Sequence, residues 1–322
     1  MTAHDLDAQF RASIVIDSEV LGLERLNERM GRSSDVASAT SALAGASPTA
    51  STHWSIGLSW PEGSHPGTDG LDRALATLGW RLAERAGALA AEGCRVELRV
   101  HQVLNGTEGE TGVGLSRGAL QWLDTAGASF DLHQHVGGKP GEESGRRPSV
   151  LIAALTIESE VADVAHISAA VGREPDSSYE IGEIGRWTQR PRTTSRWTLD
   201  LDWPTALRPG VEGLSFAITS LGSRLAEGAS TLSHSGATVL LGLYQDLSAD
   251  PWGHGIRLSR DAIGWLVTAG ADLDIDQYAH GQYIAGVLDE TDLVAARVIT
   301  PEEWAVEAKE ERRRIEERWR RV

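Results

Sequence analysis

Hydrophobic and polar positions alternate along the first part of the chain in a way that predicts strands and helices in turn. An apolar run rich in β-branched residues predicts a strand over 12–16. The apolar positions that follow have the spacing of one helix face, and we expect this short helix to end at Gly31. Over 54–60 every second residue is apolar, which is typical of a half-buried strand.

A longer apolar stripe with helical spacing follows and predicts the longest helix, over 70–92, with Gly93 after its end. A strand is expected over 94–102. Ser116 is a good N-cap residue for a further helix, and the last strand is expected over 129–136. The predicted order of elements is therefore β-α-β-α-β-α-β.

The same pattern returns in the second half of the chain. Residues 197–279 align with residues 54–136 without a gap, and residues 157–161 align with residues 16–20. Self-similarity of this length is the mark of a repeated unit. The sequence thus predicts two copies of one domain.

We expect a first repeat over 1–136, a flexible glycine-rich linker over 137–147 and a second repeat over 148–280. A tail over 281–322 contains an amphipathic helix from about residue 301. The element order favours an α+β fold in which each repeat is a two-layer sandwich, a ferredoxin-like variant. The two sandwiches are expected to pack as a pseudo-dimer, with separate domains as the alternative.

Composition excludes several classes of protein. No run approaches the 18 apolar residues of a membrane span, and the N-terminus resembles no secretory signal, so we expect a cytoplasmic protein without a membrane partner. A net charge of −16 argues against nucleic-acid binding. The single cysteine, Cys94, excludes an internal disulfide framework.

Three repeated features carry a resemblance to a known family. They are a helix that ends in Gly-Arg-x-x-Asp, at 31–35 and 172–176, a Trp-led strand, and a closing Trp-Leu-x-x-x-Gly-x-x-x-Asp unit, at 122–131 and 265–274. With these features the chain resembles a tandem copy of the bacterial domain-of-unknown-function family 4279. The resemblance implies a fold but no activity and no catalytic residues.

The two copies differ most before the Trp-led strand. The second copy has a stretch over 179–196 that looks like a β-hairpin, whereas the first has a low-complexity loop over 37–50. Arginines on such a hairpin can grip a carboxylate or phosphate, and the alternative is a solvated hairpin. The candidate binding residues of the hairpin and of the later loop 248–255 are Tyr179, Glu183, Trp187, Arg190, Arg192, Arg196, Trp252 and His254.

Histidines provide the weaker chemical alternative. His133 and His135 lie two residues apart on one strand and share a face, and His101 on a neighbouring strand could complete a metal site. The second copy has no histidine at these positions, so a semi-exposed sheet face is the favoured interpretation. Without any short catalytic motif we predict no cofactor and no catalytic residue, and whether the protein is an enzyme stays open, with a non-catalytic role favoured.

The tail has a strong helix start at Thr300-Pro-Glu-Glu, and Trp304, Ile315 and Trp319 share one stripe of the helix. This helix is expected either to dock a partner or a second copy, or to pack back on the acidic repeats.

The function favoured by the sequence is a non-catalytic cytoplasmic protein-binding module of the immunity or inhibitor type, whose partner has a basic surface. The alternative is a small-molecule sensor or enzyme that binds an anionic ligand in the cleft between the two repeats.

Overall fold

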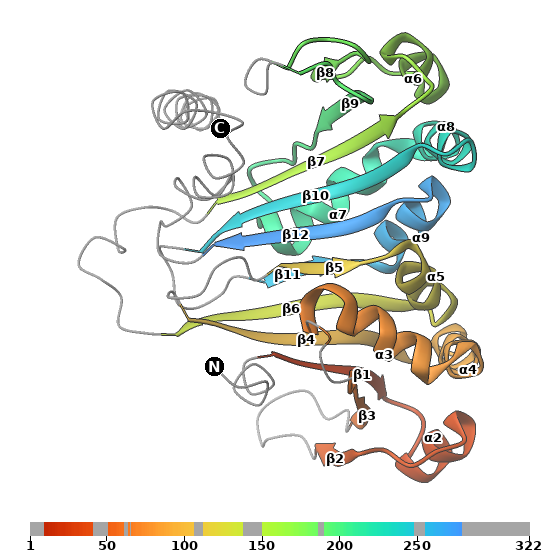
Figure 1. Ribbon diagram of the computed structural model, residues 1–322. Helices are drawn as coiled ribbons and strands as arrows, with labels where there is room; N and C mark the ends of the chain where they lie inside the picture. Colours follow the sequence, from red (N-terminus) through yellow and green to blue (C-terminus); the bar gives the residue numbers. More distant parts are fainter. Residues whose placement is uncertain are drawn as a thin grey trace.

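The computed structural model shows a mixed α+β chain built on two six-stranded sheets (Figure 1). Each sheet is mixed, because one pair of neighbouring strands is parallel and the other pairs are antiparallel. The structure describes residues 10–40, 51–60, 64, 66–105, 112–137, 150–185, 190–247 and 255–278.

The two sheets have the same order of equivalent strands. Across the first sheet the strands are β11 (Gly255–Leu258), β6 (Ala128–Gly137), β4 (Arg95–Asn105), β1 (Phe10–Ser18), β3 (Ser51–Gly57) and β2 (Val36–Thr40). Across the second they are β5 (Val113–Leu115), β12 (Asp272–Tyr278), β10 (Thr238–Asp246), β7 (Val150–Ser159), β9 (Ser195–Asp200) and β8 (Ser177–Tyr179). The four main strands predicted for each half are confirmed.

Each sheet takes one short strand from the other half of the chain. β11 pairs with β6 and sets Arg257 opposite Asp131, while β5 pairs with β12 and sets Gly114 opposite Asp274. These two strands occupy matching positions in the aligned halves, so the exchange is reciprocal (Figure 1). Both strands lie next to segments expected to be loops, and the sequence analysis missed them.

The described residues form eight α-helices and two single π-helical turns. The first half contributes α2 (Leu23–Met30), η1 (Pro66–Gly70), α3 (Leu71–Leu78), α4 (Trp80–Ala91) and α5 (Arg117–Thr125). The second contributes α6 (Val164–Val171), η3 (Pro209–Gly213), α7 (Leu214–Ser220), α8 (Gly222–His234) and α9 (Arg260–Ala269). The predicted N-cap is confirmed, since the Ser116 hydroxyl accepts a hydrogen bond from the Ala119 amide at 3.3 Å.

The prediction of one continuous helix over 70–92, and over the matching 213–235, is wrong. Gly79 separates α3 from α4 with a φ of 77°, and Gly222 at the start of α8 has a φ of 79°. A right-handed helix needs a negative φ at every residue, so neither helix continues through its glycine. The apolar stripe nevertheless runs across the break, which is why the sequence pattern concealed it.

A tryptophan caps each break. Trp122 Nε1 donates to the Gly79 carbonyl at 3.2 Å, and Trp265 Nε1 donates to the Gly222 carbonyl at 2.9 Å. The Gly79 carbonyl also accepts a hydrogen bond from the Leu82 amide at 3.2 Å, so the Trp122 indole N–H is a second donor at the break. The tryptophan of the repeated Trp-Leu unit therefore has a structural role.

Both sheets bury one face and leave the other partly open. Along β7, for example, Ala153, Leu155 and Ile157 are buried while the residues between them are half-buried. The buried faces join the apolar helix faces in one continuous core that spans both halves of the chain and includes Trp54 and Trp197. The opposite faces carry polar and charged residues, and the candidate site lies on one of them.

Residues 37–40 were expected within a loop but belong to β2, which pairs with β3. No helix among the described residues is long and apolar enough to cross a membrane.

Candidate functional site

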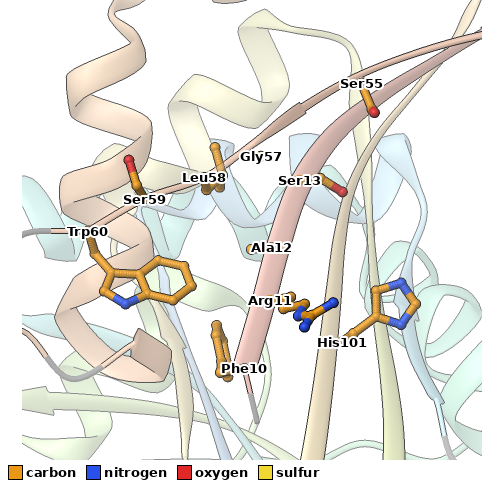
Figure 2. A pocket seen from close by; sticks show the side chains of 10 residues that line it. All are labelled: Phe10, Arg11, Ala12, Ser13, Ser55, Gly57, Leu58, Ser59, Trp60 and His101. Carbon is orange, nitrogen blue, oxygen red and sulfur yellow. The ribbon is translucent and has the colours of Figure 1, made fainter. Parts of the chain in front are cut away.

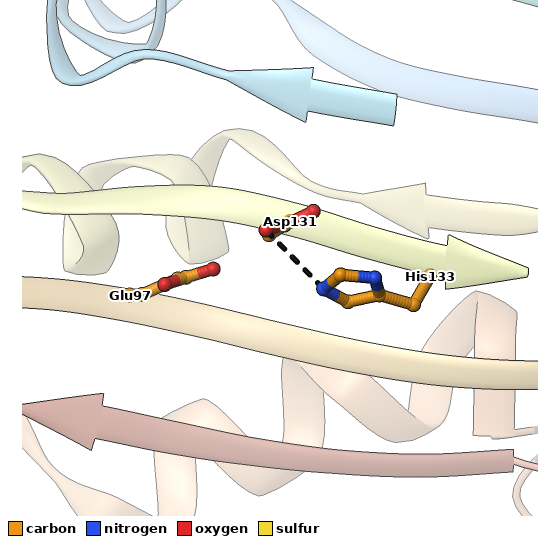
Figure 3. A group of neighbouring side chains, drawn as sticks. All are labelled: Glu97, Asp131 and His133. Atoms are coloured by element: carbon orange, nitrogen blue, oxygen red, sulfur yellow. Dashed lines mark ion pairs between the residues drawn. The ribbon is translucent and has the colours of Figure 1, made fainter. Parts of the chain in front are cut away.

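Charged side chains line the open face of the first sheet on β4 and β6. These two strands are parallel neighbours, and their register sets Arg99 beside Asp131 and His101 beside His133. Alternation along a strand points every second residue to the same face. Glu97, Arg99 and His101 of β4 therefore share the open face with Asp131 and His133 of β6. Figure 3 shows Glu97, Asp131 and His133 on the two strands.

Glu97 is buried although it lies on the open face, since only 1% of its surface is exposed. The Arg99 guanidinium contacts Glu97 Oε2 at 3.2 Å, and Glu97 Oε1 has no hydrogen-bond partner. Burial, followed by the close approach of the Asp131 carboxyl, raises the pKa of the Glu97 carboxyl, and the Arg99 charge only partly opposes these two effects. A buried carboxyl with a perturbed pKa is typical of a functional site.

Asp131 and His133 complete a compact cluster with Glu97. His133 Nε2 lies 3.3 Å from Asp131 Oδ2. One donor atom from each of the three residues lies within 4.8 Å of the other two (Figure 3). The His101 ring stacks on the His133 ring, with 5.0 Å between centroids and 12° between planes, and this contact orients the imidazole.

A cavity of about 480 Å³ opens beside this cluster, where β3 ends at Gly57 and the antiparallel β1 begins at Phe10. One wall of the cavity is aromatic, and the other carries polar side chains. Phe10 and Trp60 form an aromatic wall, with ring centroids 5.5 Å apart in an edge-to-face arrangement. Figure 2 shows Arg11 on the other side of β1, pointing toward His101.

His101 belongs to both features. It lines the cavity and stacks on His133, whose imidazole lies beside Asp131. His101 therefore links the cavity to the cluster.

A neighbouring ion-pair group on the same face has a counterpart in the second sheet. Asp17 accepts from Arg95 and lies 2.8 Å from His53 Nδ1. Burial acts to raise the pKa of Asp17, but the hydrogen bonds from Arg95 and His53 outweigh it and lower the pKa. In the second sheet Arg196 Nε pairs with Glu158 at 2.7 Å. The position is thus occupied by an ion pair in both halves, which indicates a structural role.

The cluster itself is not repeated in the described part of the second sheet. Asp274 aligns with Asp131, and burial raises the pKa of the Asp274 carboxyl. Leu240 stands where the first sheet has Glu97, and Asp276 stands where it has His133. Among the described residues, Glu97, Asp131 and His133 form the only group of three potential metal ligands of this kind.

The hairpin predicted over 179–196 is present in its described part. Tyr179 of β8 pairs with Arg196 of β9, and Ile184 forms an isolated antiparallel bridge with Pro191. The Arg192 guanidinium carbon lies 4.1 Å from the Tyr179 ring centroid, a cation–π contact.

The other hairpin candidates also contact neighbouring residues. Arg196 is paired with Glu158, and the Glu183 carboxylate accepts from the Glu180 amide at 3.1 Å. The Arg190 side chain is exposed, and its carbonyl accepts from the Gly185 amide. The structure therefore brings Tyr179, Arg192 and Arg196 together as a stacked group, not as an open clamp.

Several sequence candidates fall outside the described residues. They are Trp187, Trp252, His254, Trp304, Ile315, Trp319 and the side chain of His135. The sequence analysis missed Glu97 and the cavity residues Arg11 and Trp60. The one available signal was Glu97 itself, a single acidic residue between Val96 and Leu98, at a position that aligns with Leu240 in the second half.

Comparison with known proteins gives a family match for the second half of the chain. No curated protein and no solved structure matches the chain. Residues 149–280, which run from β7 to β12, match the model of a family described as Domain of unknown function (DUF4279). This match supports, for the second half of the chain, the family that the sequence resembles.

Proposed function

We propose that the chain binds a small anionic molecule with an aromatic or apolar part in the cavity beside β1. The observation that carries the proposal is the pairing of an aromatic wall, Phe10 and Trp60, with Arg11 and His101 around one cavity of about 480 Å³. Ligand sites of about 300–1,000 Å³ with apolar walls and a few polar groups are the usual form of small-molecule sites.

The two walls of the cavity contact different parts of the ligand. The apolar part of the ligand packs against Trp60 and Phe10, where burial of apolar surface drives binding. Its carboxylate or phosphate is held by Arg11, whose planar guanidinium suits bidentate pairing. This site lies around β1 of the first sheet, whereas the sequence suggested the cleft between the halves.

The test is a titration of the full chain with benzoate, indole-3-acetate and phenyl phosphate, followed by calorimetry and thermal shift. We expect one of these probes to bind with a 1:1 stoichiometry, and Arg11→Ala to weaken its binding at least tenfold. Arg25→Ala removes a comparably exposed arginine from α2 and serves as the matched control. Absence of binding by all three probes, or equal binding by Arg11→Ala, refutes the proposal.

We further propose that the first half is a second copy of the same family domain, so that the chain is a tandem duplication. The support is the equal strand order of the two sheets, the reciprocal exchange of β5 and β11, and the repeated tryptophan caps. In this view the halves are ferredoxin-like two-layer units related as a pseudo-dimer.

A second candidate function, binding of a basic protein partner in the cytoplasm, has its own supporting observation. Ile181 and Ile184 on the hairpin are 44% and 53% exposed. Apolar side chains exposed on a hairpin suit a protein contact, and the net charge of −16 favours a basic partner. A salt-sensitive partner captured by the full chain, lost from Ile181→Ser/Ile184→Ser and retained by Val20→Ser, supports this candidate. Capture that the hairpin changes leave unaltered contradicts it.

A further inference from the structure

We propose that Glu97, Asp131 and His133 bind one divalent transition-metal ion, with Zn²⁺ as the best match. The three side chains come from neighbouring parallel strands, and each offers one donor atom within 4.8 Å of the other two. A Zn²⁺ ion held at about 2.0–2.2 Å from its ligands draws donor atoms to about 3.4 Å from one another. Small changes of side-chain torsion are enough to close that difference. The proposal is independent of the small-molecule ligand proposed above.

The second observation that points to a cation is the state of Glu97. This carboxylate is 99% buried, and its Oε1 atom has no hydrogen-bond partner. Buried polar atoms almost always have a partner, and a buried carboxylate oxygen needs one most. A cation between Glu97 and Asp131 supplies the missing interaction for Oε1.

The surroundings of the three residues resemble the outer shell of a metal site. Arg99 donates to Glu97 Oε2 at 3.2 Å and restricts the carboxylate, while Oε1 has no hydrogen-bond partner. His101 stacks on His133 and restricts its ring. Groups that orient ligands in this way commonly influence metal affinity by tenfold or more.

The donor set selects the class of ion. One imidazole nitrogen and two carboxylate oxygens suit Zn²⁺ or another transition metal, whereas Mg²⁺ and Ca²⁺ prefer oxygen ligands only. Two carboxylates and a neutral imidazole carry two negative charges, which one divalent ion balances. Three protein ligands also leave a coordination position for water or for an anion.

The matched control lies in the second sheet. Asp274 aligns with Asp131 and shares its strand position, but it has Leu240 where the first sheet has Glu97. Asp274→Asn therefore removes an equivalent carboxylate without touching the proposed ligands.

The experiment is calorimetric titration of the chelator-treated full chain with ZnCl₂, with MgCl₂ as the comparison ion. We expect one Zn²⁺ site whose affinity falls at least tenfold in Asp131→Asn and in His133→Asn, stays unchanged in Asp274→Asn and exceeds the affinity for Mg²⁺. His133 has a side chain that is 44% exposed, so its replacement preserves the fold, and circular dichroism verifies this. Cobalt substitution gives a second readout, because His133→Asn should remove the visible absorption of the bound ion. Unchanged zinc binding by His133→Asn and Asp131→Asn, or no stoichiometric binding by the full chain, overturns the proposal.

Discussion

Replacing Gly79 by alanine tests the broken helix directly, because the two possible structures predict effects of opposite sign. In the structure Gly79 has φ 77° and ψ 159°, a conformation that is essentially limited to glycine. A β-carbon at Gly79 meets no heavy atom within 4 Å, so the cost comes from the backbone alone. We expect Gly79→Ala to lower the free energy of unfolding by about 1–3 kcal/mol. A continuous helix through this position would instead gain about 1 kcal/mol from the same change.

Urea unfolding followed by circular dichroism at 222 nm measures both the sign and the size of this effect. Gly118→Ala is the matched control, since Gly118 lies exposed within α5 and its nearest neighbour to a new β-carbon is 3.6 Å away. There the alanine should stabilise the protein by up to about 1 kcal/mol. A stabilising Gly79→Ala would refute the break and the role of Trp122 as its cap.

Two further predictions concern the ion pairs and the exchanged strands. Asp17→Asn should cost about 1–3 kcal/mol at pH 7, because Asp17 accepts from both Arg95 and His53. The pKa of Asp17 is lowered in the folded state, so its contribution is present above the ordinary pKa of 3.8 and is lost as the pH falls through the folded-state pKa. Unfolding of both proteins from pH 7 to pH 2.5 should therefore show a shrinking difference, and a constant difference would contradict the assignment. Leu115→Ala in β5 and Leu258→Ala in β11 should each cost about 2–5 kcal/mol, since both side chains are buried in the core. Effects below about 0.5 kcal/mol, as expected at loop positions, would argue against the exchange.

The sequence predicted those elements whose signals lie within a single segment. The serine N-cap at Ser116 and the glycine after α2, Gly31, each act on their own helix, and both are confirmed. β5 and β11 contain only three and four residues, which is too short for an alternating pattern to emerge. Their place in the opposite sheet depends on contacts between the two halves, which no local pattern encodes.

The candidate site was less accessible from sequence for a similar reason. Alternation correctly puts Glu97 on the outward face of β4, between Val96 and Leu98. Its burial depends on neighbouring strands, which set Val15 beside it in register and bring Asp131 next to it. Asp131 has an aligned counterpart in Asp274, but only the first half adds Glu97 and His133, and the sequence comparison gave no reason to join these three residues.

The reciprocal strand exchange also bears on how the chain folds during synthesis. β6 ends at Gly137, but its outer partner β11 is not complete until Leu258 has been made. At about 5–20 residues per second, an edge of the first sheet stays uncovered for roughly 6–24 s after its own half has emerged from the ribosome. An unpaired edge strand is a template for pairing with other chains. A nascent chain of this protein should therefore depend on chaperones during that interval, and slower translation of the second half should increase aggregation.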